Sequence, residues 1–123
     1  MFAAKSDKNW AEGNQCVLNG NADAAANRLY YAVFQAVKSY AILINQMDPD
    51  KPGTGSAHTT ALEIVGQGPM GQTYRRHFNR LKGYRESADY SPVNVRMEDL
   101  KGVMGEADCI RKHFLKKSTV TGL

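Results

Sequence analysis

The chain has 123 residues, of which 42% are hydrophobic and 23% charged, and its formal net charge at pH 7 is +4. This length and composition are typical of one soluble globular domain that buries its own core without disulfide or metal staples. A membrane-spanning class is excluded, because no apolar run approaches the roughly 20 residues that cross a bilayer.

The start of the chain and its cysteines bear on where the protein works. Charged residues follow Met1 and Phe2 closely, so no secretory signal is recognisable. Cys16 and Cys109 match no metal spacing, and two cysteines make no disulfide framework. We therefore expect a cytoplasmic protein with no membrane association. Its single domain should cover residues 1–123, with a frayed tail at about 118–123.

The first two predicted helices come from a 3.6-residue pattern of apolar side chains. One is expected from about Asp7 to Asn19. The next begins after the N-cap Asn21 and runs to about Asn45, with apolar side chains over about half of its circumference. Tyr31 lies on the opposite side of this second helix. A further helix or a second subunit should therefore cover that side too.

The second half of the chain predicts three more helices. Residues 46–57 form a loop because of their prolines, glycines and aspartates, and a short helix around Thr59–Val65 follows. A fourth helix should run from about Gly71 to Ala88, before Ser91 and Pro92, and a last one from about Val95 to Lys117. No stretch alternates like a β-strand. The predicted fold is therefore all-α, a four- to five-helix up-and-down antiparallel bundle.

Charge is distributed unevenly along the chain. Residues 75–85 carry five basic side chains and no acidic one, whereas residues 111–123 carry four basic side chains after an acidic stretch. The two basic patches are either solvated helix faces or one polyanion-binding surface, and the second interpretation requires both patches to lie on the same side. The residues predicted to bind a nucleic acid or nucleotide are Arg75, Arg76, Arg80, Lys82 and Arg85.

Arg85 occupies an unusual position for a charged residue. On a helix over residues 74–88 it falls inside the apolar arc, and Asp89 follows one turn later. An arginine directed at a core must be paired or must await a ligand. Either an ion pair between Arg85 and Asp89 organises the bundle, or Arg85 faces a cleft where it can grip a phosphate. Tyr90 either packs or stacks on a base.

The three histidines have no partner at the spacing of a metal site. His77 belongs to the apolar arc of the fourth helix and is predicted to be a satisfied core residue. His58 follows a Gly- and Ser-rich stretch and is expected to be a cap or loop residue. No phosphate loop, dinucleotide fingerprint or nucleophile elbow is present, so the sequence predicts neither a metal nor a cofactor.

Three short motifs resemble a known family. Arg28, Tyr30, Tyr31 and Phe34 match the Arg-x-Tyr-Tyr-Ala-x-Phe signature of the second helix of HEPN domains. Residues 85–90 resemble the later Arg-x-x-Ala-Asp-Tyr element, which ends in Asp89 and Tyr90, and Ser56-Ala57-His58 resembles the Ser/Thr-x-His that opens the third helix. The motifs stand in the family's order, and the resemblance covers roughly residues 5–117.

The resemblance implies an α-helical bundle that commonly forms homodimers. It also implies RNA or nucleotide binding, often beside a nucleotidyltransferase partner in a toxin–antitoxin pair. Many HEPN domains are metal-independent RNases that use Arg-x4–6-His. Arg85 matches the arginine, but the positions that follow hold Asp89, Tyr90, Ser91 and Pro92, so the histidine is missing.

Three hypotheses for the function remain open at this point. The first is a non-catalytic module that dimerises through helices including the second and fourth and binds RNA or a nucleotide. The second is an atypical RNase that uses Arg85 with Asp89, Tyr90 or a histidine brought from elsewhere, His58 or His77. The third is a structural or protein-interaction bundle in which Arg85 is fully engaged inside the subunit.

Overall fold

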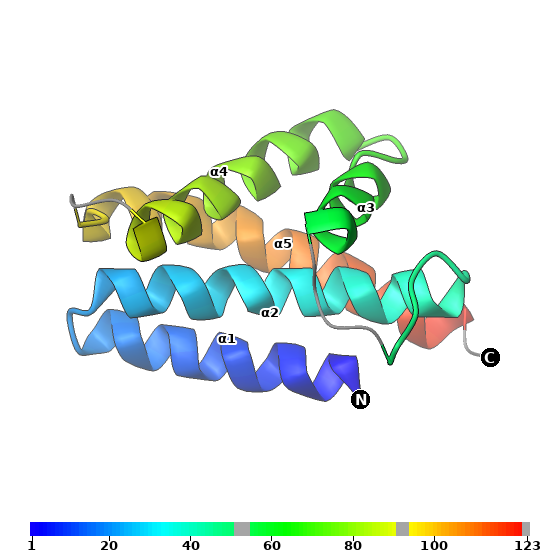
Figure 1. Ribbon diagram of the computed structural model, residues 1–123, viewed down its shortest axis with the longest axis horizontal. Coiled ribbons are helices and arrows are strands. Elements are labelled where there is room, and N and C mark those ends of the chain that lie inside the picture. The colour runs from blue at the N-terminus through cyan, green and yellow to red at the C-terminus, as the bar shows by residue number, and fades with distance from the viewer. Residues whose placement is uncertain (51–54, 91–93, 122–123) are drawn as a thin grey trace.

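The structure, a computed structural model, describes residues 1–50, 55–90 and 94–121 (Figure 1). Within these residues it contains only α-helices, which confirms the all-α bundle. The five helices are α1 (Phe2–Leu18), α2 (Ala22–Leu43), α3 (Gly55–Val65), α4 (Gly71–Tyr90) and α5 (Met97–Thr121). Among the described residues, none of these helices is long and apolar enough to cross a membrane.

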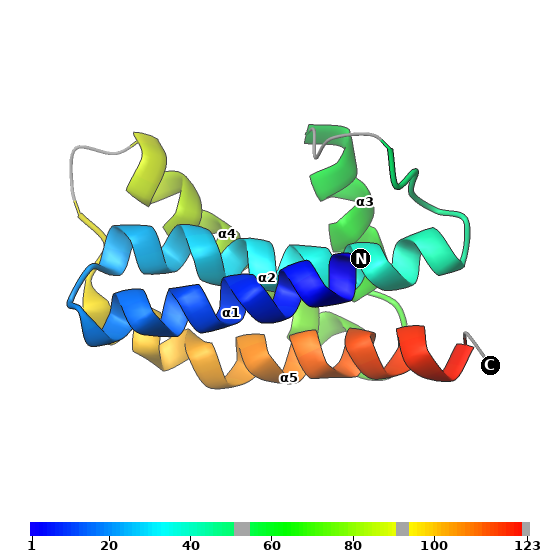
Figure 2. The same cartoon turned by 90° about the horizontal axis from the view of Figure 1, so that it is seen from below.

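Helix α2 is the centre of the bundle. It packs against each of the other four helices. Figure 2 shows α1 alongside α2, with α3 and α4 on one side of it and α5 on the other. The face of α2 opposite the apolar half is therefore bordered by α1 and α4, and Tyr31 and Ile42 on this face stay only partly buried.

The start of α2 follows the predicted capping chemistry. The side-chain oxygen of Asn21 accepts a hydrogen bond from the backbone N–H of Ala24 at 3.1 Å, which satisfies one of the free donors of the first turn. The carboxylate of Asp23 accepts a hydrogen bond from the backbone N–H of Val95 at 2.9 Å. The first turn of α2 thereby also positions the segment that leads into α5.

Helix α1 begins at Phe2, earlier than the predicted Asp7, because tertiary contacts support its first turns. The hydroxyl of Ser6 is fully buried and donates to the backbone carbonyl of Ala32 at 2.6 Å. The Lys38 ammonium lies 4.4 Å from the centre of the Phe2 ring. Both contacts tie α1 to α2, and the sequence pattern of α1 alone does not contain them.

Helices α3 and α5 are also longer than predicted. Helix α3 begins at Gly55 rather than near Thr59, while α4 runs to Tyr90 and the predicted break at Ser91-Pro92 lies outside the described residues. The tail expected to fray over residues 118–123 is helical as far as Thr121. There the hydroxyls of Ser118 and Thr119 donate to carbonyls one turn earlier, at 2.9 and 3.1 Å.

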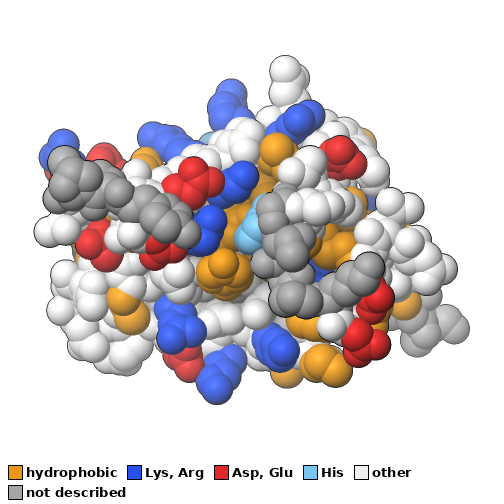
Figure 3. All heavy atoms as spheres, viewed as in Figure 1, with side chains coloured by type: hydrophobic (Ala, Val, Ile, Leu, Met, Phe, Trp, Pro, Cys, Tyr) orange, Lys and Arg blue, Asp and Glu red, His pale blue; other side chains and the backbone are white. Residues whose placement is uncertain are grey.

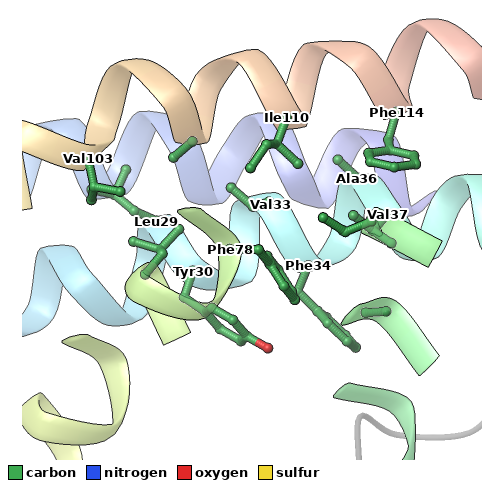
Figure 4. Packing of buried hydrophobic residues seen from close by; sticks show 14 of the residues in the cluster. Leu29, Tyr30, Val33, Phe34, Ala36, Val37, Phe78, Val103, Ile110 and Phe114 are labelled. Atoms are coloured by element: carbon green, nitrogen blue, oxygen red, sulfur yellow. The ribbon is translucent and has the colours of Figure 1, made fainter. Parts of the chain in front are cut away.

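The hydrophobic core runs along α2. Figure 4 shows Leu29, Val33 and Val37 between the helices, with Val103, Ile110 and Phe114 of α5 on one side. On the other side the rings of Tyr30 and Phe34 lie next to Phe78 of α4, and the Tyr30 hydroxyl points away from α5. The core residues of the second and last helices follow the apolar pattern expected from the sequence.

Gly13 allows α1 to approach α2 closely. A Cβ atom at this position would lie 2.6 Å from Cδ2 of Leu29, a side chain that is itself fully buried. No such constraint exists at Gly102 in α5, where a Cβ atom would meet no described atom within 4 Å. Close packing of α1 on α2 therefore requires a glycine at position 13, whereas no neighbouring atom requires one at position 102.

We predict that Gly13→Ala destabilises the protein by about 1–3 kcal/mol, because overpacking forces α1 and α2 apart. The matched control, Gly102→Ala, should be neutral or stabilise by up to about 1 kcal/mol, since alanine is the better helix former. Urea unfolding of both variants measures the difference. Equal midpoints for Gly13→Ala and the unmodified protein would contradict the close packing.

Candidate functional site

An aromatic cluster joins α2, α3 and α4. Tyr30 stacks on Phe78 at 5.4 Å between ring centres, and Tyr31 meets Tyr30 edge-on at 5.4 Å. The imidazole of His58 lies 4.6 Å from the Phe34 ring and 5.4 Å from the Tyr30 ring. Helices α3 and α4 thus both pack against the aromatic motif residues of α2, which are Tyr30, Tyr31 and Phe34.

His58 is a buried member of this cluster and not a cap or loop residue. It lies in the first turns of α3, is 8% exposed, and its Nδ1 is 2.5 Å from the hydroxyl oxygen of Tyr30. The expectation was wrong because composition alone treated residues up to 57 as loop. The Ser56-Ala57-His58 motif was the sequence signal that pointed to a special position.

The protonation of the Tyr30–His58 pair follows from its surroundings. Burial raises the pKa of Tyr30 far above its usual value, although the charge of Arg85 acts in the opposite direction. Tyr30 therefore keeps its proton, and it shares one hydrogen bond with Nδ1 of His58, which either group donates depending on the tautomer of the neutral imidazole. Nδ1 is engaged by Tyr30 in both tautomers, so Nε2 is an N–H donor when Tyr30 donates and an acceptor when Nδ1–H donates.

The charged groups that act on the pKa of His58 indicate a positive potential at the site. Burial lowers the pKa of His58, and the charges of Arg85 and Lys82 lower it further, against a smaller opposing effect of Glu86. The cations therefore dominate over the acidic groups at this point. Figure 3 shows a histidine side chain at the centre of this face, with basic side chains beside it.

Arg85 lies over the two tyrosines. Its guanidinium carbon is 5.2 Å from the centre of the Tyr30 ring and 5.6 Å from that of Tyr31, so both rings contribute cation–π attraction. Nη1 donates to the Tyr31 hydroxyl at 3.3 Å and lies 3.5 Å from the carboxylate of Asp89. The side chain is only 13% exposed. Arg85 is thus paired both within α4 and across to α2.

One donor of Arg85 is left over. Its Nε atom is buried and makes no hydrogen bond within the described residues. An unpaired buried donor costs free energy. The Nε–H of Arg85 is therefore a hydrogen-bond donor that the described contacts leave unused. The other motif residue of this element, Tyr90, belongs to α4, but its side chain lies outside the described residues.

The remaining predicted binding residues lie on the outer surface of α4. Arg75, Arg76 and Arg80 are exposed. Arg80 donates to the Tyr84 hydroxyl at 3.3 Å, and Lys82 lies 3.7 Å from the carboxylate of Glu86. Both contacts are local to one helix and to its surface. The basic charge of α4 therefore remains exposed along the outer surface of the helix.

The second basic patch is not a simple continuation of the first. Arg111 is buried in α5, where it bonds to Asp7 of α1 at 2.7 Å and to Asp108 at 3.3 Å. Its guanidinium carbon also lies 5.1 Å from the centre of the Trp10 ring. Arg111 thus holds α1 against α5, and it does not contribute to a polyanion-binding surface.

The structure also places the other sequence candidates. Arg28 is exposed and lies 3.6 Å from the carboxylate of Glu12, so it links α2 to α1 instead of joining the cluster. His77 is only partly buried, and within the described residues its Nδ1 has no hydrogen-bond partner, so it is not the satisfied core residue expected. His77 is also two helical turns from Arg85, about 12 Å along α4.

One known family matches almost the whole chain. A family model for the HEPN domain matches residues 3–117. The chain belongs to the HEPN domain family. No curated protein and no solved structure gives a significant match. Within the parts of this HEPN chain that the structure describes, no group of three or more His, Cys, Asp or Glu side chains could hold a metal ion.

The structure shows what the HEPN motifs do in this chain. Tyr30, Tyr31 and Phe34 of the second-helix motif bind His58 on one side and support Arg85 on the other. The motifs are separated by tens of residues in sequence, yet they make one cluster. Arg85 and His58 come from different helices and approach each other through the tyrosine pair.

We predict that stability falls as the pH is lowered below about 6.5, where unfolded histidine titrates. The pKa of folded His58 is depressed, so in this range the unfolded chain binds a proton that the folded chain does not. The contribution of neutral His58 to the free energy of unfolding is therefore fully present only above this pH range. Unfolding free energies from about pH 7.5 to 5 should show the decline, and His58→Gln should reduce its slope.

His113 supplies the control for this titration. Burial also lowers the pKa of His113, with a further contribution from Lys117. His113→Gln should therefore remove its own share of the pH dependence and leave the share of His58. An identical slope for His58→Gln and the unmodified protein would contradict the buried, neutral state of His58.

Proposed function

We propose that this HEPN protein is a non-catalytic module that binds RNA or a nucleotide through Arg85 and the basic surface of α4. The observation that carries the proposal is the Arg85 guanidinium, which lies over the Tyr30 and Tyr31 rings with its Nε donor unpaired within the described residues. A phosphate group complements this charge and this free donor. Arg85 can offer it several N–H donors in a fixed plane.

The chemistry of His58 supports binding over cleavage. A general base for RNA cleavage needs a free lone pair that accepts a proton near neutral pH. When the Tyr30 hydroxyl donates to Nδ1, the lone pair of His58 is occupied, and the lowered pKa of the imidazole opposes a second proton. In that tautomer His58 contributes a donor, as Arg85 does. Donors hold a phosphate, but by themselves they do not deprotonate a ribose hydroxyl.

A second candidate function is an atypical RNase. It is favoured by the placement of His58 and Arg85 around the same two tyrosines, although the two residues are not at Arg-x4–6-His spacing. In that case the imidazole would break its hydrogen bond to Tyr30 during the reaction, so that its nitrogen could accept a proton from the RNA. A cleavage assay on single-stranded RNA, with Arg85→Ala as control, separates the two candidates. Cleavage that persists in Arg85→Ala would come from a contaminant.

We predict that Arg85→Gln weakens binding of single-stranded RNA by at least about tenfold, the loss expected for a charged hydrogen-bonding group. The matched control is Lys116→Gln, which removes the same charge from an exposed position on α5. Fluorescence anisotropy over a range of salt concentrations measures both variants. Affinity of the unmodified protein should fall steeply with salt, since phosphate contacts release counterions.

The same measurement decides against the proposal if RNA affinity is absent or does not change between low and moderate salt. Equal losses for Arg85→Gln and Lys116→Gln would also count against a specific role of Arg85. In either case the bonds from Arg85 to Tyr31 and Asp89 would serve the fold alone. Unfolding curves of Arg85→Gln show whether the variant remains folded under assay conditions.

We also propose that the protein forms a homodimer and acts with a nucleotidyltransferase partner in a toxin–antitoxin system. HEPN domains commonly dimerise, and Ile42 near the C-terminal end of α2 is only partly covered within one subunit. Light scattering on the purified protein should give twice the mass of the chain at micromolar concentration. A monomeric mass that does not change with concentration would exclude the homodimer.

A further inference from the structure

An open groove of about 380 Å³ lies between α1 and α2. Its walls are polar, and none of the residues that line it was among the predicted binding residues of α4. The lining residues are Lys5, Lys8, Asn9, Glu12, Arg28 and Gln35. The groove is therefore built mainly from the first helix, which the charge pattern of the sequence did not single out.

The groove carries an excess of positive charge. Lys5, Lys8 and Arg28 face a single carboxylate, that of Glu12. Glu12 lies 3.6 Å from Arg28, and both side chains are about half exposed, so this pair is weak and well solvated. Lys8 makes no ion pair or hydrogen bond within the described residues. At least one ammonium group is thus available to an anion.

The hydrogen bonds along the groove have a fixed direction. Arg28 can only donate, and its Nη1 lies 3.4 Å from Oδ1 of Asn9. The amide nitrogen of Asn9 must then face the other way, and it donates to Oε1 of Gln35 at 2.7 Å. Oε1 of Gln35 is thus occupied by Asn9. The groove offers the ammonium groups of Lys5 and Lys8 and the amide of Gln35 as donors, and among its lining residues the carboxylate of Glu12 is the one charged acceptor.

The groove lies next to Arg85 on the same face of the molecule. Arg28, Tyr31 and Gln35 succeed one another along one side of α2, at the three- and four-residue spacings that make helix neighbours. The hydroxyl of Tyr31 accepts the hydrogen bond from Arg85. Figure 3 shows basic side chains on this face both near its centre and below, over α1 and α2. Tyr31 thus lies between two cationic regions.

We infer that this groove is a phosphate-binding site, with Lys8, Lys5 and the amide of Gln35 as the donors. A donor-rich groove with surplus positive charge fits an anion that carries several acceptor oxygens. Its source is either the backbone of an RNA that also contacts Arg85 or a free polyphosphate. The first source rests on the proposed function, whereas phosphate binding in the groove does not.

The side-chain amides of Asn9 and Gln35 provide a direct readout, because an anion in the groove changes their NMR shifts. The first probe is inorganic tripolyphosphate, titrated into the unmodified protein, Lys8→Gln and the control Lys116→Gln. We expect both amide signals to move, with affinity reduced several-fold in Lys8→Gln and unchanged in Lys116→Gln. No movement at millimolar tripolyphosphate would overturn the inference.

The second probe identifies the source of the phosphate. Oligouridylates of three and twelve nucleotides are compared, since the longer one offers more phosphates to contact Arg85 and the groove together. If the source is RNA, Lys8→Gln weakens the twelve-nucleotide complex more than the three-nucleotide complex and lowers the salt slope of the longer one by about 0.7, the value of one lost phosphate contact on a single strand. A twelve-nucleotide complex that is insensitive to Lys8→Gln would exclude RNA from the groove.

The two proposals fail in different ways. If tripolyphosphate moves the amides but neither oligonucleotide binds, the groove remains a phosphate site and the proposed function of Arg85 is wrong. If both oligonucleotides bind through Arg85 while the amides of Asn9 and Gln35 stay unmoved by either probe, the proposed function stands and the groove is not a phosphate site.

Discussion

The hydroxyl of Tyr30 lies inside the bundle, and burial obliges it to find a hydrogen-bond partner. That partner is His58, at 2.5 Å, so α3 must pack with its first turns against α2. The other surroundings of the same ring are Phe78 and Arg85 of α4. One side chain of the central helix thereby determines where two later helices meet. The positions of all other groups at the site follow from this arrangement.

The cluster has an electrostatic consequence beyond packing. Arg85 is held over two tyrosine rings with little exposure to water, where its charge is screened less than at the surface. Burial lowers the pKa of the neighbouring His58 imidazole, and the charge of Arg85 lowers it further, so the charged imidazolium is disfavoured at this site. Such a site fits the proposed binding of a phosphate. The chain lacks the histidine at Arg-x4–6-His spacing.

The cations of the chain divide into those that hold the bundle together and those left for solvent or a ligand. Arg111 forms an ion pair with Asp7 and lies over the Trp10 ring, so its charge is neutralised within the subunit. The outer cations of α4, which are Arg75, Arg76, Arg80 and Lys82, and Lys8 of α1 have at most local partners on their own helices within the described residues. This division is decided by neighbouring helices rather than by the density of basic residues along the chain. It places the available charge on both sides of Tyr31.

The sequence by itself determined the helical class, the approximate helix order, the cap at Asn21 and the apolar face of α2, because these depend on local chemistry and on a period of 3.6 residues. The position of Arg85 inside an apolar arc was visible in the same way. Only the tertiary structure decided the partners of Tyr30, Tyr31 and Arg111, which are 28, 54 and 104 residues away in sequence. Such pairings depend on which helices become neighbours, and helical periodicity contains no information about that choice.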